Sequence, residues 1–301
     1  MGLFSRKRTN GNGDVAVADE PVGYAPASDR TGEALLQEID DLTRENRTDR
    51  SAAREQRILR LRHQAALELI ADSPARPGYP EPAFEALPEG SSVPEVAAAE
   101  LTPEILRAAI LRSGCLLVRG LIDTGEATRL RDEIDSAFEA KESEVKDETT
   151  EAYWSAFEAD SRFDLSDRQW IGGRSNAWGV DSPRVMVDLF DTFERTGFRQ
   201  VATGYLGERP AISVNKCTLR RVHPEDFEEN KSSSWHQDGA FMGGVRALNV
   251  WLSLSRAGDR SPGLDVVPRR LEEIVPTGTE GAAFDWSVAT DVAQSAAGDV
   301  G

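Results

Sequence analysis

The chain has 301 residues, a formal net charge of -17 at pH 7 and 29% charged residues. Its length suffices for one catalytic domain with an N-terminal extension and leaves too little chain for a second large domain. Such an acidic protein lacks the basic face that nucleic acids and anionic membranes require, which excludes both as expected partners.

The first hundred residues divide by composition into three segments. Residues 1–30 are rich in Gly, Ser, Asn and Asp without periodicity, which predicts a disordered N-terminus. Residues 31–73 carry apolar residues at helical spacing, so we expect an amphipathic helical segment that packs on its own domain or on a second subunit, with ligand recognition as the alternative. His63 lies there among arginines, which predicts a solvated side chain without a metal role. Residues 74–100 contain several prolines and are expected to form an extended connector.

The folded domain is expected over residues 101–301, and it opens with a helix, a short strand and a second helix. Thr102 followed by proline predicts the start of the first helix, and Gly114 predicts its end. A strand is expected over residues 115–118. Asp123 or the threonine after it then supplies the N-cap of the second helix.

Residues 141–181 form a charged insertion that carries several tryptophans and phenylalanines. The insertion either closes as a lid over a substrate site or packs on the core as a surface flap. The proline after Ser182 begins another amphipathic helix, which runs towards Tyr205 and ends at Gly207. Residues 211–222 then alternate in polarity, as in a long strand.

The strongest chemical signal lies in residues 235–255, with the sequence WHQDGAFMGGVRALNVWLSLS. In a strand, His236 and Asp238 point to the same side. An imidazole and a carboxylate on one face can hold two of three facial positions on a non-heme Fe(II), which leaves the opposite face open for a co-substrate and oxygen. The following residues alternate in polarity. Asn249 and Trp251 fall on the face that mixes amide, indole and hydroxyl groups, as the wall of a partly polar pocket does.

Turn-forming residues and short strands continue beyond this segment, with the next strand expected over residues 264–267. This alternation behind a set of helices predicts an α+β protein with a mainly β catalytic core. The core is expected to be a double-stranded β-helix (jelly roll, cupin-like) with flanking N-terminal helices.

The His-x-Asp motif on its strand and the helix–strand–helix opening together resemble the phytanoyl-CoA dioxygenase family of Fe(II)/2-oxoglutarate-dependent oxygenases, over residues 101–301. The resemblance implies that His236 and Asp238 bind Fe(II). It also implies that 2-oxoglutarate and O2 are consumed to give succinate, carbon dioxide and a hydroxylated small organic or lipid-like molecule. Hydroxylation is implied over halogenation, because a halogenating relative leaves the coordination position of Asp238 vacant for a halide. The chain departs from the family in having two arginines after Pro268, where Gly-Ser-His is common.

The family also uses a second histidine as third ligand and an arginine that grips the 2-oxoglutarate carboxylate, and no histidine follows His236 here. His223 is a poor substitute, since the family places no ligand there. We therefore expect a C-terminally truncated chain that lacks the last strands of the jelly roll, which argues against catalysis by this form. The alternative is a non-catalytic remnant that acts as a binding or interaction module. A cupin-type protein is disfavoured because cupins supply several histidines to the metal.

Two cysteines, Cys115 and Cys217, lie far apart in apolar runs, which predicts buried free thiols in a reducing compartment. The N-terminal sequence lacks the apolar core of a secretory signal, and no stretch approaches the length of a membrane span. A cytoplasmic protein is expected, and the oligomeric state stays open.

Overall fold

The computed structural model describes seven stretches of the chain, residues 26–72, 78–90, 93–160, 175–222, 235–242, 245–258 and 263–298. Its helices are α1 (Gly32–Thr48), α2 (Ala52–Asp72), α3 (Pro103–Ser113), α4 (Thr124–Glu142), α5 (Glu148–Tyr153), α6 (Pro183–Arg195), α7 (Phe198–Leu206), α9 (Gly239–Met242) and α10 (Thr290–Ala297). Its strands are β1 (Glu95–Ala97), β2 (Leu117–Arg119), β3 (Asn176–Trp178) and β4 (Thr218–Arg220). Among these residues, no helix has the length and apolar content that a membrane crossing requires.

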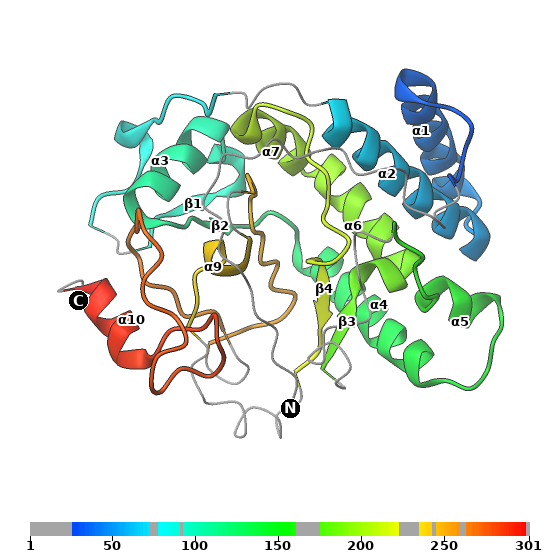
Figure 1. The fold of residues 1–301 in the computed structure, drawn as a ribbon. Helices are drawn as coiled ribbons and strands as arrows, with labels where there is room; N and C mark the ends of the chain where they lie inside the picture. The colour runs from blue at the N-terminus through cyan, green and yellow to red at the C-terminus, as the bar shows by residue number, and fades with distance from the viewer. Residues whose placement is uncertain are drawn as a thin grey trace.

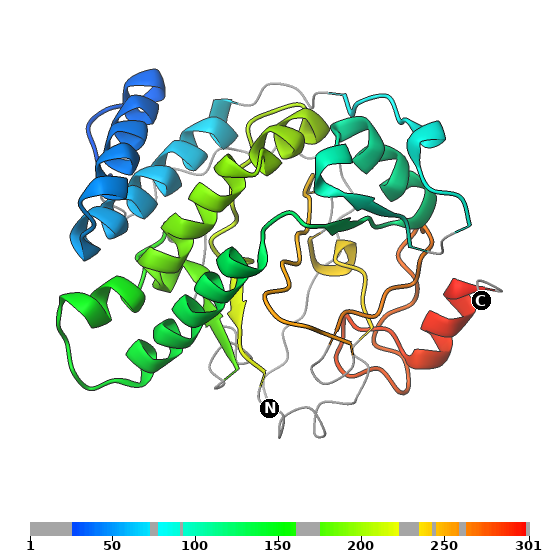
Figure 2. The ribbon, with the colours of Figure 1, turned by 180° about the vertical axis from the view of Figure 1, so that it is seen from behind.

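Helix α6 is the centre of the helical layer. It contacts α2, α4, α5 and α7, and Figures 1 and 2 show it running between α2 and α4. Val185, Met186 and Val187 are buried on α6, because the helix has neighbours on several sides. The expected single helix from Ser182 towards Tyr205 is wrong: it divides into α6 and α7 at Gly197, which has a φ of 74°. Such a left-handed backbone conformation suits glycine and interrupts a helix.

Residues 31–73 form a hairpin of two helices. Ser51 begins α2, where its hydroxyl accepts a hydrogen bond from the backbone N–H of Arg54 at 3.3 Å. Leu35 and Ile39 of α1 pack against Leu61 of α2, and α2 in turn contacts α5 and α6. The hairpin therefore packs on the chain's own domain. Residues 26–30, predicted to belong to the disordered terminus, include Ser28, whose N–H donates to Gln64 of α2; residues 1–25 lie outside the described part.

His63 on α2 is buried, so the prediction of a solvated side chain is wrong. The residue is 5% exposed, and its Nε2 accepts a hydrogen bond from the backbone N–H of Asp160 at 3.1 Å. Its ring meets that of Phe157 edge to face, with 5.6 Å between the ring centroids. These partners lie almost a hundred residues further along the chain, which is why the local sequence around His63 did not reveal them.

The helix signals at the start of the domain are confirmed. The Thr102 hydroxyl accepts from the N–H of Ile105 at 3.2 Å, and Gly114 ends α3 with a φ of 75°. The Asp123 side chain caps α4 by accepting from the N–H of Glu126 at 2.8 Å. Each of these contacts joins residues only a few positions apart, so the local sequence is enough to predict where the helices begin and end.

The proline-rich segment 74–100 is more than a connector. Strand β1 lies within it and pairs in parallel with β2, so that Val96 faces Val118 across the pair. Helix α3 makes the crossover between the two strands and packs beneath them, where Leu87, Val96 and Ile105 belong to one buried cluster. The folded part of the chain thus begins before residue 101.

The described ends of the aromatic insertion pack on the protein core. Trp178 is 3% exposed and clusters with Val214 and Phe157. Strand β3 pairs antiparallel with β4, which places Ala177 opposite Leu219. These contacts favour the surface flap over the lid for this part; Phe163 and Trp170 lie outside the described residues.

The strand predicted over residues 211–222 is shorter than expected, because residues 214–216 form a turn and only β4 is paired.

Residues 245–258 contain no helix and no paired strand, yet their burial alternates as in a strand. Leu248, Leu252 and Leu254 are half-buried, whereas Asn249 and Trp251 between them are exposed. Val250 breaks the alternation, being 46% exposed. The jelly roll stays a prediction.

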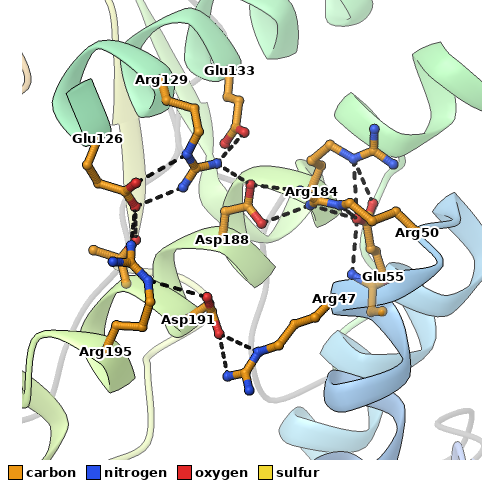
Figure 3. A network of polar contacts seen from close by, with 12 residues as sticks. Arg47, Arg50, Glu55, Glu126, Arg129, Glu133, Arg184, Asp188, Asp191 and Arg195 are labelled. Atoms are coloured by element: carbon orange, nitrogen blue, oxygen red, sulfur yellow. Dashed lines mark hydrogen bonds and ion pairs between the residues drawn. The ribbon is translucent and has the colours of Figure 1, made fainter.

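A network of charged side chains fastens the helical hairpin to α4 and α6 (Figure 3). Asp188 of α6 lies at its centre and accepts two hydrogen bonds from the guanidinium of Arg50, at 2.8 and 3.1 Å. Arg129 of α4 donates to the same carboxylate at 2.6 Å. The fully buried Glu55 accepts from Arg50 at 2.9 Å and from Arg184 at 3.1 Å. Because the partners come from α2, α4, α6 and the turn before α2, the network fixes how these elements meet.

Candidate functional site

The predicted metal pair lies immediately before the one-turn helix α9. His236 Nε2 and Asp238 Oδ1 are 3.3 Å apart, so the imidazole and the carboxylate converge as expected for side chains two residues apart on one face. Their side chains are 38% and 36% exposed, which leaves them accessible from solvent. The backbone N–H of Met242 donates to the carbonyl of Asp238 at 2.9 Å and closes the turn of α9 on the motif.

Each side chain of the motif has a different partner. The second carboxylate oxygen of Asp238, Oδ2, accepts a hydrogen bond from the side-chain amide of Asn249, a residue predicted to face the pocket. Gln237 turns elsewhere: its amide donates to the carbonyl of Glu273 at 3.1 Å and accepts from the N–H of Val275 at 2.8 Å. With these two hydrogen bonds the Gln237 amide pairs with the backbone of residues 273 and 275, as a neighbouring strand would. They hold the backbone between His236 and Asp238 in place.

Two aromatic residues from later in the chain line the histidine side of the pair. The Trp286 ring lies edge-on to the His236 ring, with 5.2 Å between their centroids, and Phe284 packs on Trp286 with centroids 4.0 Å apart. The N–H of Val288 donates to the carbonyl of Trp235 at 2.7 Å and ties the two segments together. Sequence analysis missed Phe284 and Trp286, since no spacing rule connects them to a motif some fifty residues earlier.

Trp251 contacts Arg220, a residue of strand β4. The guanidinium of Arg220 lies over its ring, 4.9 Å from the centroid, in a cation–π arrangement. Burial lowers the pKa of Arg220 below its usual range. Trp251 itself is 51% exposed. The structure therefore brings Asn249 to the metal pair and attaches Trp251 to the neighbouring strand.

The donor geometry of the pair is compatible with a shared metal ion. Two ligands at neighbouring positions of an octahedral ion, each bound at about 2.1 Å, lie about 3 Å apart. The separation of 3.3 Å between His236 Nε2 and Asp238 Oδ1 meets this requirement. Within the described ranges, no group of three or more His, Cys, Asp or Glu side chains is assembled for a metal. His223 lies outside those ranges.

Comparison with known proteins identifies no relative. No family model, no curated protein and no solved structure matches the chain. The function is therefore argued from the chemistry and geometry of the site.

Proposed function

We propose that this protein is an Fe(II)/2-oxoglutarate-dependent dioxygenase of the phytanoyl-CoA dioxygenase type, which uses O2 to hydroxylate a small organic or lipid-like molecule. The convergence of His236 Nε2 and Asp238 Oδ1 at 3.3 Å is the observation that carries the proposal. An imidazole and a carboxylate are two of the three ligands in the facial triad of such enzymes. The proposal needs a third ligand in addition to this pair.

The residues around the pair have defined tasks in this proposal. His236 and Asp238 would hold the metal, and the Asn249 amide would orient the Asp238 carboxylate through its hydrogen bond. Bound there, Fe(II) supplies the redox chemistry that activates oxygen. The rings of Trp286 and Phe284 lie at the edge of the site and are each 36% exposed, which suits contact with an apolar substrate.

Anaerobic titration with Fe(II) and 2-oxoglutarate tests the proposal. The expected result is a weak visible charge-transfer band, which is lost in His236→Ala and in Asp238→Ala. Asn249→Ala keeps both ligands and is expected to weaken Fe(II) binding about 10- to 100-fold. Asp265→Asn is the matched control, because it removes an exposed carboxylate of the same region and should leave the band unchanged.

The titration separates this proposal from a non-catalytic binding module. A band that survives both ligand substitutions would place the metal elsewhere and refute the assignment of His236 and Asp238. Absence of any band in folded wild-type protein would favour the module. The folded state is checked by circular dichroism in each variant.

A further inference from the structure

The side chain of Gln237 joins the backbone of the metal pair to that of residues 273–275. Its amide nitrogen donates to the carbonyl of Glu273 at 3.1 Å, and its amide oxygen accepts from the N–H of Val275 at 2.8 Å. A primary amide carries a donor and an acceptor side by side, so it can serve both backbone groups at once. An apolar side chain of the same length can make neither bond.

Residues 273–275 lie directly against the motif. They run as irregular backbone, and the N–H of Val275 donates to the Gln237 side chain instead of to a backbone carbonyl. Ile274 packs on the turn after the motif so closely that a Cβ atom added to Gly239 would lie 2.9 Å from its Cδ1 atom. The hydrogen bond from Val275 therefore reports whether this segment and the motif are held together.

The two ligand side chains depend on their backbone for position. The side chains of His236 and Asp238 are 38% and 36% exposed, so packing encloses neither of them. The carbonyl of Trp235 accepts from the N–H of Val288 at 2.7 Å, which anchors the backbone on one side of the pair. Gln237 supplies the anchor between the two ligands, where a change in backbone direction would move both.

We propose that Gln237 is a positioning residue whose amide couples metal binding by His236 and Asp238 to the order of residues 273–275. The inference rests on the proposed function, since it requires the pair to bind a metal. Loss of a group that orients metal ligands typically costs 10- to 100-fold in metal affinity. The coupling is reciprocal: if the ordered segment favours metal binding, bound metal must also favour the ordered segment.

Isothermal titration calorimetry of the full chain with Co(II) measures the first half of the coupling. Co(II) prefers the same nitrogen and oxygen ligands as Fe(II). Wild-type protein is expected to bind one Co(II), and Gln237→Met is expected to weaken binding about 10- to 100-fold. Gln200→Met is the matched control: it removes an exposed amide of α7 and should leave the affinity within about twofold. His236→Ala should abolish binding.

Hydrogen exchange followed by mass spectrometry measures the second half on the peptide that contains Val275. Saturating Co(II) is expected to slow its exchange in wild-type protein. In Gln237→Met the peptide should exchange faster, and saturating Co(II) should no longer slow it. A purely structural role for Gln237 would lower stability in urea unfolding without making exchange at Val275 respond to the metal. The wild-type comparison needs no variant, so it holds even if Gln237→Met fails to fold.

The outcomes separate this inference from the proposed function. Equal Co(II) affinity in wild type and Gln237→Met, or exchange at Val275 that ignores Co(II) in wild type, overturns the coupling and leaves the metal pair standing. Absence of saturable Co(II) binding by folded wild-type protein up to about 1 mM, or binding that survives His236→Ala, overturns both proposals.

Discussion

Raising the pH from about 6 to about 9 is expected to destabilise the protein through Glu133 of α4. This residue is 9% exposed, and its Oε2 has no hydrogen-bond donor facing it among the described residues. Burial, together with the hydrogen bond and charge of Asp188, raises the pKa of the Glu133 carboxyl to about 8, although the charge of Arg129 lowers it. A protonated Glu133 can donate a hydrogen bond to Asp188, whereas an ionised one places two carboxylates side by side.

The sign and size of the effect follow from the two protonation states. The native protein keeps a proton that the unfolded chain releases above the ordinary pKa of 4.5. The stabilisation is therefore complete below that value and is lost as the pH rises through about 8. The full shift of the Glu133 pKa, from 4.5 to about 8, corresponds to about 4 to 5 kcal/mol in the free energy of unfolding. Between pH 6 and pH 9 only the part from pH 6 to about 8 is lost, which is about 3 kcal/mol before screening. The Arg129 side chain is 40% exposed, so water screens the site, and we expect a loss of about 1 to 2 kcal/mol over this range.

Urea unfolding followed by circular dichroism at several pH values measures this loss. Glu133→Gln cannot ionise but can still donate to Asp188, so its free energy of unfolding should change by less than about 0.5 kcal/mol over the same range. Glu126→Gln is the control on the same helix. Arg129 and further partners lower the pKa of Glu126, so its titration falls in the acid range and the variant should keep the wild-type loss. Equal losses in wild type and Glu133→Gln would refute the reasoning.

Two other predictions concern single side chains. Glu55→Gln replaces a fully buried carboxylate between Arg50 and Arg184 and should lower the free energy of unfolding by about 2 to 4 kcal/mol in urea titrations. Asp41→Asn, which breaks an exposed ion pair in the same hairpin, should cost less than about 0.5 kcal/mol, and a similar cost for both would contradict the role given to burial. Burial raises the pKa of the Cys217 thiol to about 11, so iodoacetamide should modify it about a hundredfold more slowly than a free cysteine at pH 8, as measured by peptide mass spectrometry. Rapid labelling of Cys217 in folded protein would show that it is not enclosed.

Contacts between distant parts of the chain explain why the prediction for His63 was wrong. Glu55 and His63 lie in a helix whose other faces carry arginines, and the sequence predicted a solvated side chain for His63. Arg184 and Asp160 cover them from more than ninety residues away in the chain. A polar side chain can be buried only when a partner forms a hydrogen bond or ion pair with it. The local sequence pattern does not show where in the chain that partner lies.

In the candidate site, too, some contacts were predictable from the sequence and others were not. The convergence of His236 and Asp238 was predictable from their spacing, and Asn249, singled out by the polarity pattern, donates a hydrogen bond to Asp238. The approach of Trp286 to His236 was not predictable, because it depends on how residues 263–298 pack against the motif.

The sequence by itself determined the features that a few neighbouring residues control. Thr102 and Asp123 cap their helices, and Gly114 and Gly207 end theirs. The two thiols are free as expected, but Cys115 and Cys217 are half-buried rather than buried. Only the tertiary structure decided which charges are buried and which aromatic rings lie beside His236. The physical reason is that caps and turns are made by contacts within one turn of backbone, whereas burial and charge pairing require segments that meet only when the whole chain folds.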